Sequence, residues 1–263
     1  MIGYYHSIDT MGTVDGHGIR YLVFLSGCKL GCLFCHNPDT WRKGTKTITV
    51  EEIINEFNRY RPFYEASNGG ITVSGGEPLL QADFVAELFK VAQSQGISTT
   101  LDTSGFASLA DIDKVLPYTD HVMFGLKGVR KSSYERLTNC NGESIIENLR
   151  YITDKHEVTI RYLIMPEVND SEEEITEFIS LIKSLKHDNI VDLLAYHEMG
   201  LYKWEALGME YKLKNVSAAT KEDVVKIKKN TAAFEESSLV ELFKMRHVGK
   251  RLYNKFYTKF IEL

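Results

Sequence analysis

Three of the four cysteines in this sequence lie within one short stretch that could bind an iron–sulfur cluster. Cys28, Cys32 and Cys35 follow the pattern C-x3-C-x2-C. A free cysteine packs as a small apolar residue, so packing gives no reason for three of them to gather in one loop. Thiolates are ligands for soft metals and for iron–sulfur clusters. Three thiolates would leave one iron of a [4Fe–4S] cluster without a protein ligand, and that iron could accept a small molecule.

Two other kinds of site can be built from the same residues. Cys32, Cys35 and His36 fit C-x-x-C-H, the attachment pattern of c-type haem. Covalent haem generally belongs to exported proteins, but we find no export signal, and the haem interpretation leaves Cys28 unused. A structural zinc site usually has four ligands. His36 could be the fourth, although its position next to Cys35 is awkward for a tetrahedron.

The composition is that of an ordinary globular protein. A chain of 263 residues can bury a full core, and 43% hydrophobic with 25% charged residues is typical of such proteins. The net charge of −5 predicts no binding to nucleic acid or to an anionic membrane, and no apolar run reaches the ~20 residues that span a bilayer. We expect a reducing, cytoplasmic location, and we interpret Cys140 as a lone loop thiol.

The elements that must position these residues alternate between strand and helix. Apolar and β-branched runs predict strands at 19–26, 70–74, 97–102, 121–127, 158–164 and 190–196. Helical spacing and two Ser/Thr-x-x-Glu capping boxes predict helices at about 49–60, 81–95, 109–116, 143–153, 171–185 and from 220. Glycines at 12, 16 and 18 indicate an irregular loop within residues 1–18.

This alternation predicts an α/β fold with parallel strands and right-handed crossovers. We expect a partial (β/α)6 barrel with outer helices over residues 1–235, with a doubly wound open sheet as the alternative. Residues 236–263 are expected to form a C-terminal helical extension, because their apolar residues have helical spacing. In either fold, ligands bind at the carboxyl ends of the strands.

Residues able to do chemistry lie at those carboxyl ends. In chain order they are the cysteine loop, Gly75-Gly76-Glu77, Asp102, Lys127 and His197. Arg161 lies within the fifth predicted strand. Side chains alternate along a strand. This alternation predicts two sets that face a polar lumen filled by water or by a ligand: Met123, Gly125 and Lys127, and Ser98, Thr100 and Asp102.

Several motifs together resemble one family. They are TVDGHGIR at 13–20, the cysteine motif with His36-Asn37, SGGE at 74–77, LDT at 101–103, IRY at 160–162 and YHEMG at 196–200. The set closely resembles pyruvate formate-lyase activating enzymes, members of the radical S-adenosylmethionine (SAM) superfamily, over about residues 3–230. The chain carries one cluster motif, whereas activases of other glycyl radical enzymes often carry an inserted ferredoxin-like segment with extra cysteines.

The resemblance implies a reaction. SAM would chelate the open iron through its methionyl amine and carboxylate, and one electron from the reduced cluster would break its C–S bond. The 5′-deoxyadenosyl radical would then take a hydrogen atom from a glycine Cα of pyruvate formate-lyase, with flavodoxin or ferredoxin as electron donor. The alternatives are an activase of a different glycyl radical enzyme and a non-catalytic zinc- or haem-binding protein. A primary-carbon radical attacks most C–H bonds, so the site would have to be sealed.

The resemblance also implies a role for each residue. Cys28, Cys32 and Cys35 would be the cluster ligands. SAM would be bound by Phe34, His36, Gly75, Gly76, Glu77, Asp102, Leu126, Lys127 and His197. A monovalent cation beside SAM would be bound by Asp102, Thr103 and Met123, and the glycine peptide by Asp15 and Arg161. Two residues depart from the family: Gly125 stands where an Asp usually completes the cation site, and His17 stands where proline is usual.

Overall fold

The computed structural model describes residues 1–232. The predicted helical extension at 236–263 and its boundary lie outside the described residues and stay predictions. The strands are β1 (Ile2–Gly12), β2 (Arg20–Leu25), β3 (Thr47–Thr49), β4 (Gly70–Gly75), β5 (Ser98–Thr103), β6 (His121–Leu126), β7 (Val158–Ile164) and β8 (Ile190–Ala195). The α-helices are α1 (Val50–Ala66), α2 (Ala82–Ser94), α3 (Leu109–Val115), α4 (Lys131–Leu137), α5 (Glu143–Thr153), α6 (Glu172–Ser184), α7 (Leu201–Ala206) and α8 (Lys221–Ala232). Short 3-10 helices are η1 (Pro38–Thr40), η2 (Pro78–Gln81) and η3 (Leu116–Tyr118).

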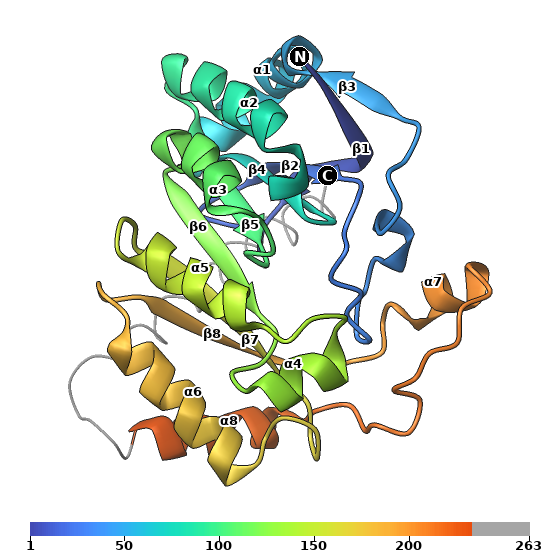
Figure 1. The fold of residues 1–263 in the computed structure, drawn as a ribbon. Coiled ribbons are helices and arrows are strands. Elements are labelled where there is room, and N and C mark those ends of the chain that lie inside the picture. The colour runs from blue at the N-terminus through green and yellow to red at the C-terminus, as the bar shows by residue number, and fades with distance from the viewer. Residues whose placement is uncertain (233–263) are drawn as a thin grey trace, which may run out of the picture.

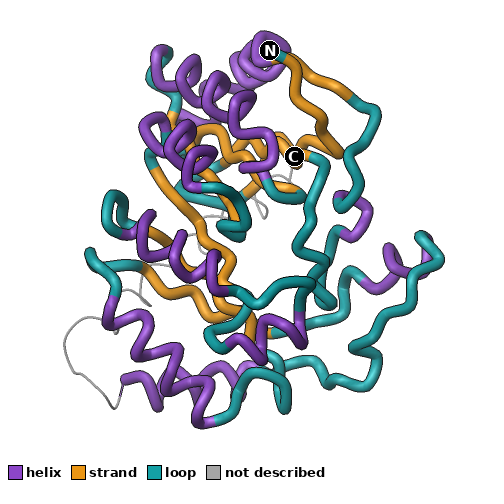
Figure 2. Tube along the Cα trace, in the orientation of Figure 1, coloured by secondary structure: helices purple, strands orange, loops and turns teal. Residues whose placement is uncertain are grey.

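The strands form one curved sheet in the order β3-β1-β2-β4-β5-β6-β7-β8. From β2 to β8 all neighbours in this order are parallel, whereas β1 pairs antiparallel with β2 and with β3. Helices α1, α2, α3, α5 and α6 lie along the outside of the sheet (Figures 1 and 2). The α/β fold with a parallel sheet and outer helices is confirmed, and all six predicted strands are present within a residue or two. Among residues 1–232, no helix has both the length and the apolar character that crossing a membrane requires.

The amino-terminal segment differs from the prediction. The sequence predicts an irregular loop over residues 1–18, but Ile2–Gly12 forms β1 and pairs with β2. Most of this strand is only partly buried and its register with β2 shifts twice, so it lacks the clean alternation that reveals a strand. The irregular loop is confined to the residues between β1 and β2, which include Asp15 and His17.

Helix α1 also runs further than predicted. Its capping box is confirmed: the Thr49 hydroxyl accepts from the Glu52 N–H, and the Glu52 carboxylate accepts from the Thr49 N–H. The helix then continues through Pro62 to Ala66. Tyr64 holds this last turn: it is fully buried, stacks on Phe57 of the same helix at 4.5 Å and donates its hydroxyl to the Thr10 carbonyl of β1. At the second predicted box, Ser171 caps α6, but the Glu174 carboxylate accepts from Ser133 instead.

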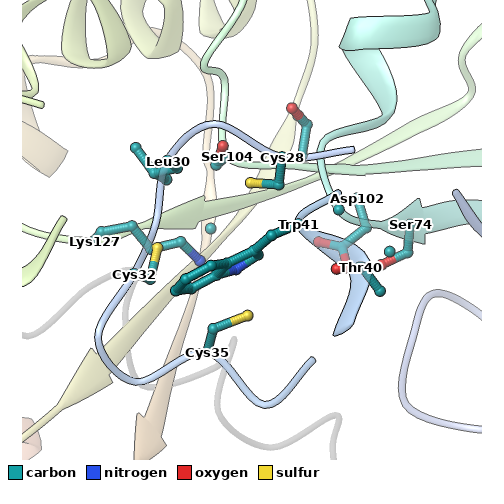
Figure 3. A pocket seen from close by; sticks show the side chains of 14 residues that line it. Cys28, Leu30, Cys32, Cys35, Thr40, Trp41, Ser74, Asp102, Ser104 and Lys127 are labelled. Atoms are coloured by element: carbon teal, nitrogen blue, oxygen red, sulfur yellow. Dashed lines mark hydrogen bonds between the residues drawn. The ribbon is translucent and has the colours of Figure 1, made fainter. Parts of the chain in front are cut away.

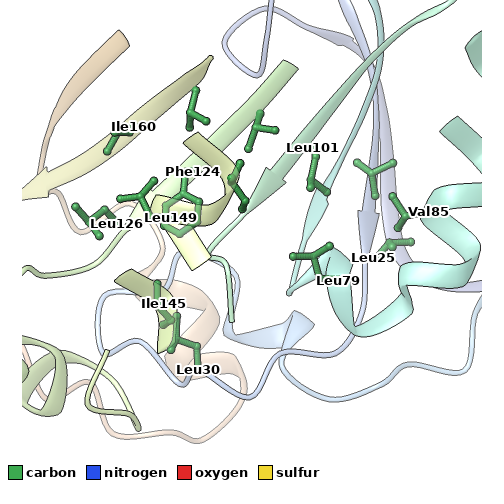
Figure 4. Close-up of a cluster of buried hydrophobic side chains, with 14 of the residues drawn as sticks. Leu25, Leu30, Leu79, Val85, Leu101, Phe124, Leu126, Ile145, Leu149 and Ile160 are labelled. Atoms are coloured by element: carbon green, nitrogen blue, oxygen red, sulfur yellow. The ribbon is translucent and has the colours of Figure 1, made fainter. Parts of the chain in front are cut away.

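The two faces of the parallel strands have different chemistry. On the outward face, buried apolar side chains such as Leu101, Phe124 and Ile160 pack against the helices, where Val85 and Leu149 meet them (Figure 4). On the inward face most of the buried or half-buried side chains are polar, and include Arg20, Thr72, Ser74, Thr100, Asp102, Arg161 and Asp192. The predicted polar lumen is therefore present, and burying such a set requires hydrogen-bond or ligand partners.

Candidate active site

A pocket lies at the carboxyl ends of the parallel strands, the edge at which α/β sheets bind ligands. It contains about 560 Å³ of space free of protein atoms, including space open to solvent. Figure 3 shows side chains from the cysteine loop and from several strand ends around it. Eight sequence-predicted residues line the pocket: Cys28, Cys32, Cys35, Gly75, Gly76, Asp102, Thr103 and Lys127. The sequence analysis did not assign Thr40, Trp41, Ser74 or Ser104, which line it as well.

Hydrogen bonds to neighbouring backbone hold the cysteine loop, which has no regular secondary structure between β2 and η1. The Gly27 N–H donates to the Thr40 carbonyl at 2.7 Å, and the Cys28 N–H donates to the Trp41 carbonyl at 2.9 Å. The Cys35 N–H donates to the Cys32 carbonyl at 3.0 Å and closes a turn between those ligand candidates. These bonds fix the loop where the first parallel strand ends.

The segment that follows α4 supports the loop from a second side. The Leu33 N–H donates to the Leu137 carbonyl at 2.9 Å, and the Asn139 N–H donates to the Leu30 carbonyl at 2.8 Å. Gly31 has a φ of +63°, and a Cβ there would lie 2.0 Å from the Asn139 side chain, so the backbone conformation and this close contact both favour glycine. The same contacts bring Cys140 close enough to the motif to act on the pKa of Cys32.

The three thiols line one pocket, but they do not meet at one point. Within residues 1–232, no three side chains of the metal-ligating types are placed to hold a single ion. One zinc ion would need thiolate sulfurs about 4 Å apart, since each Zn–S bond is about 2.3 Å. In a cubane cluster each thiolate binds a different iron, so the sulfurs stand further apart. Three separated thiols around one pocket therefore fit a cluster better than a zinc ion.

Burial keeps these cysteines protonated in the absence of a metal. Desolvation raises the pKa of Cys32 to about 12, while the Lys127 ammonium acts in the opposite direction. Desolvation also raises the pKa of Cys28 and of Cys35. A thiolate is the form that binds iron. Binding of a cluster would therefore release protons from the thiols. The positive charge of the irons would stabilise the thiolates, which the apolar surroundings do not.

The Gly75-Gly76-Glu77 turn joins the second parallel strand to the cysteine loop. The Gly76 N–H donates to the Leu25 carbonyl, and the Glu77 N–H donates to the Gly27 carbonyl, both at 2.8 Å. A Cβ at Gly75 or Gly76 would lie 2.3 to 2.4 Å from backbone atoms of Leu25 or Gly27. The close approach of the cysteine loop is thus sufficient to explain both glycines, even without a ligand.

Glu77 is turned away from the pocket and is not among its lining residues. Its carboxylate is buried and accepts from the Thr103 hydroxyl (2.6 Å), the Ser104 hydroxyl (2.6 Å), the Ser104 N–H (2.8 Å) and the Leu79 N–H (3.1 Å). Burial raises its pKa, and these donors act in the opposite direction. In this structure Glu77 ties the end of β4 to the end of β5.

The ends of β5 and β6 place a carboxylate and an ammonium at the pocket. Asp102 accepts from the Ser74 hydroxyl at 2.7 Å, and the Lys127 ammonium lies 5.9 Å from the Phe34 ring. Leu126, named for SAM binding with Lys127, packs in the apolar core instead, because the two side chains leave opposite faces of the strand (Figure 4). The Leu126 side chain therefore cannot line the pocket, and only its backbone could reach a ligand.

Two predicted histidines stack beside the cysteine loop. The rings of His36 and His197 lie 4.4 Å apart at 37°, and the His36 Nε2 lies 3.2 Å from the His197 carbonyl. Burial lowers the pKa of His36. Gly200 packs so closely on this pair that a Cβ would lie 2.7 Å from the His36 Cα. The loop after β8 thereby meets the end of the cysteine motif, 161 residues earlier in the chain.

The predicted peptide-binding residues meet inside the lumen. Arg161 Nη1 lies 3.7 Å from Asp15 Oδ1 and 3.9 Å from Asp102 Oδ2, and its Nε lies 3.8 Å from Asp192 Oδ2. These are ion-pair separations, longer than hydrogen bonds. Arg161 Nε is buried and has no hydrogen-bond acceptor in the described residues. Burial and Asp102 raise the pKa of Asp15, and Arg161 acts against them.

Arg20 forms the floor of this lumen and was not singled out from the sequence. It is fully buried, and its guanidinium donates to the hydroxyls of Thr72 and Thr100, both at 2.9 Å, and to the Ile71 carbonyl at 2.6 Å. The Thr72 hydroxyl donates in turn to the Asp15 carbonyl at 2.7 Å. Arg20 thus fixes the loop that carries Asp15. The inward parity of its strand position is the signal that could have identified it.

Comparison with known proteins agrees with this geometry. Residues 22–179 match the model of the radical SAM superfamily, and the chain belongs to that superfamily. It is 40% identical over 232 residues to the pyruvate formate-lyase-activating enzyme of Listeria monocytogenes, covering 85% of this chain and 94% of that protein. The pyruvate formate-lyase 1-activating enzyme of Escherichia coli K12 is also 40% identical over 232 residues, covering 87% of this chain and 94% of that protein. Within the superfamily, the chain therefore belongs with the pyruvate formate-lyase-activating enzymes.

A solved structure shares the fold. A domain of the pyruvate-formate lyase-activating enzyme from Bacteroides vulgatus ATCC 8482 aligns with a TM-score of 0.53 at 24% identity, covering 63% of this chain and 94% of that chain. Family membership supports the cluster interpretation of the cysteine motif and leaves the zinc and haem interpretations without support.

Proposed function

We propose that this protein activates pyruvate formate-lyase by abstracting a hydrogen atom from a glycine Cα in that enzyme. The observation that carries the proposal is the pocket itself, where three cysteine thiols and the ends of parallel strands surround space for a ligand. The curated relatives that match nearly their whole length are named for this activation. An activase of a different glycyl radical enzyme would use the same chemistry, and the partner distinguishes the two.

The residues present fit a [4Fe–4S] cluster held by three thiolates. Cys28, Cys32 and Cys35 supply soft donors around one pocket, and no fourth ligand is needed if SAM takes the remaining iron. When bound, the cluster and SAM supply one-electron cleavage of the sulfonium and a carbon-centred radical. The chain's own contribution is to hold both groups in a fixed position at the carboxyl ends of the strands.

The proposed SAM site surrounds the open side of the cysteine loop. Phe34, His36 and His197 do not line the pocket itself, but they lie beside it and would form an aromatic wall for the bound ligand. The ammonium of Lys127, which does line the pocket, offers a counter-charge for a carboxylate. Gly75 and Gly76 present backbone at the pocket wall. Glu77 and Leu126 remain part of the proposal, Glu77 by fixing the ends of β4 and β5 and Leu126 through its backbone. Asp102 completes the set from β5.

The proposed monovalent-cation site depends on a position that is altered in this chain. Asp102, Thr103 and Met123 lie on adjacent strands, with Asp102 paired to Met123 in the register. At Gly125, a Cβ would lie 2.5 Å from the Lys127 ammonium. The Lys127 ammonium thus occupies the space that an Asp side chain at position 125 would need. We infer that Lys127 supplies part of the positive charge that a bound cation would supply.

The proposed peptide site is the lumen beyond SAM. Arg161 has unused hydrogen-bonding capacity at its buried Nε, and three carboxylates surround it at ion-pair separations. A backbone carbonyl of the substrate can accept from this guanidinium, and Asp15 can accept from a peptide N–H. A bidentate guanidinium would fix an extended glycine segment with its Cα towards the pocket. Flavodoxin or ferredoxin remains the proposed electron donor.

The test is anaerobic activation followed by electron paramagnetic resonance (EPR). The loaded protein is incubated with reductant, SAM and pyruvate formate-lyase, and in parallel with other glycyl radical enzymes. A glycyl radical that forms only with pyruvate formate-lyase supports the proposal, and one that forms only with another enzyme replaces the partner. Arg161→Lys should retain cluster and SAM cleavage but lose radical yield at least tenfold. Arg150→Lys is the matched control, because Arg150 is an exposed helix residue that bonds Ser184.

A further inference from the structure

The indole of Trp41 carries a buried hydrogen-bond donor that has no acceptor in the described residues. Its Nε1 is inaccessible to solvent and is not hydrogen-bonded. Trp41 lines the same pocket as the three cysteines, and Figure 3 shows its ring among their sulfur atoms. A buried donor without an acceptor is uncommon in folded proteins, because desolvation of the N–H is not offset. Its presence beside the pocket points to an acceptor that arrives with a ligand.

Several contacts fix the position of this indole. The Trp41 carbonyl accepts from the Cys28 N–H, which ties the residue to the first cysteine of the motif. Its ring meets the Trp204 ring edge-on, with centroids 5.3 Å apart at 88°. Trp204 in turn packs on Tyr211 at 5.3 Å and hydrogen-bonds the cysteine loop. The donor is therefore held in place before any ligand binds.

The two tryptophan side chains lie next to different atoms of the same cysteine. The Trp204 N–H donates to the Cys35 carbonyl at 2.9 Å and is satisfied. The Trp41 side chain lies beside the Cys35 sulfur at the wall of the same pocket (Figure 3). The acceptor available to Trp41 is thus a sulfur atom that gains negative charge when the site is loaded.

We propose that Trp41 donates an N–H···S hydrogen bond to the sulfur of Cys35, or to a neighbouring cluster sulfide, and so raises the reduction potential of the cluster. This inference rests on the proposed cluster. Reduction adds one electron and increases the negative charge on the sulfurs, so a fixed donor stabilises the reduced form more than the oxidised form. Trp41 is a positioning and tuning residue that does not contact the reacting carbon.

The first test is an EPR-monitored redox titration of the loaded protein, with iron and sulfide analysis of each sample. Trp41→Phe should lower the equilibrium constant for one-electron reduction about three- to tenfold, where tenfold corresponds to 59 mV for one electron. Trp204→Phe is the matched control, because its indole bonds a carbonyl and not a sulfur. An unchanged potential in Trp41→Phe, or an equal shift in both variants, would overturn the inference.

The second test leaves Trp41 in place, so it does not depend on a Trp41 variant that assembles its cluster. The chain has two tryptophans, and both can be labelled with 15N in the indole. Electron–nuclear double resonance of the reduced cluster should show a 15N coupling that persists in Trp204→Phe. No coupling, or a coupling that appears only after SAM is added, would contradict an N–H···S bond. Absence of iron and sulfide in the unmutated protein would instead refute the proposed function.

Discussion

The replacement Glu77→Gln tests whether this residue is a buried strut or a direct SAM ligand. The carboxylate accepts four hydrogen bonds, two at each oxygen. A carboxamide keeps one acceptor oxygen and places an NH2 group at the other position. The hydroxyls of Thr103 and Ser104 can rotate to accept, but a backbone N–H cannot. Whichever way the amide is oriented, the N–H of either Leu79 or Ser104 loses its acceptor.

The expected loss of stability follows from that orphaned N–H. Leaving one buried donor unsatisfied costs about 1–3 kcal/mol, and the weaker neutral acceptor adds to this. Removal of a buried charge offsets part of the loss, since burial raises the pKa of Glu77. A net loss of about 1–3 kcal/mol lowers the thermal midpoint of a chain of this size by roughly 2–6 °C.

The assay is the thermal midpoint of the cluster-loaded protein, measured with and without SAM. A strut predicts that the midpoint falls by the same amount in both conditions. Glu87→Gln is the control, because Glu87 is an exposed partner of the amino terminus and its loss should change little. A Glu77→Gln protein with an unchanged midpoint without SAM, and a lower midpoint only with SAM, would refute the strut and favour direct contact with the ligand.

Two further predictions concern the floor and the rim of the barrel. Burial, with His17 and Arg20 nearby, lowers the pKa of His121 from 6.5 to about 4, so the unfolded chain binds more protons in that window and stability falls as pH drops from about 6.5 towards about 4. After discounting for partial exposure, the loss in free energy of unfolding is about 2 kcal/mol. His121→Asn should therefore reduce the fall in thermal midpoint between about pH 7 and pH 5. Parallel curves of thermal midpoint against pH for the two proteins would contradict this prediction. Gly200→Ala places a Cβ 2.7 Å from the His36 backbone, so SAM affinity by equilibrium dialysis should fall at least tenfold with cluster content unchanged. Gly44→Ala, whose Cβ would make an ordinary 3.4 Å contact with Ser26, is the control, and equal affinities in the two variants would contradict the argument.

Much of this site could be predicted because its residues follow strands with a regular period. Asp102 and Lys127 end apolar runs of predictable length, and parallel strands bring their carboxyl ends to one edge. The cysteine spacing needed no fold at all. Strand β1 escaped detection because it is partly exposed and bulged, which removes the alternation that reveals a strand. The assignment of Leu126 to SAM binding did not take strand alternation into account. The alternation that directs the Lys127 side chain to the pocket directs the Leu126 side chain to the core.

Other features depend on contacts between loops, which have no periodic signal. Trp41 and Trp204 are 163 residues apart in the sequence, and only the folded chain places both beside Cys35. The segment around Asn139 supports the cysteine loop through backbone hydrogen bonds. Any residue can form such bonds, so the amino-acid sequence does not predict them. Glu77 reads as an exposed turn residue until Thr103 and Ser104 are brought to it by the neighbouring strand. These contacts had to be found in the structure.

The central claim is that three thiolates hold a cluster whose fourth iron is left for SAM. Electron–nuclear double resonance of the reduced cluster, with SAM labelled by 15N in its amine and 17O in its carboxylate, tests this most directly. We predict couplings from both labels in the parent protein, and loss of both in Cys32→Ala. Full iron and sulfide content with no coupling from either label, or a side chain of the protein bound to the fourth iron, would contradict the account.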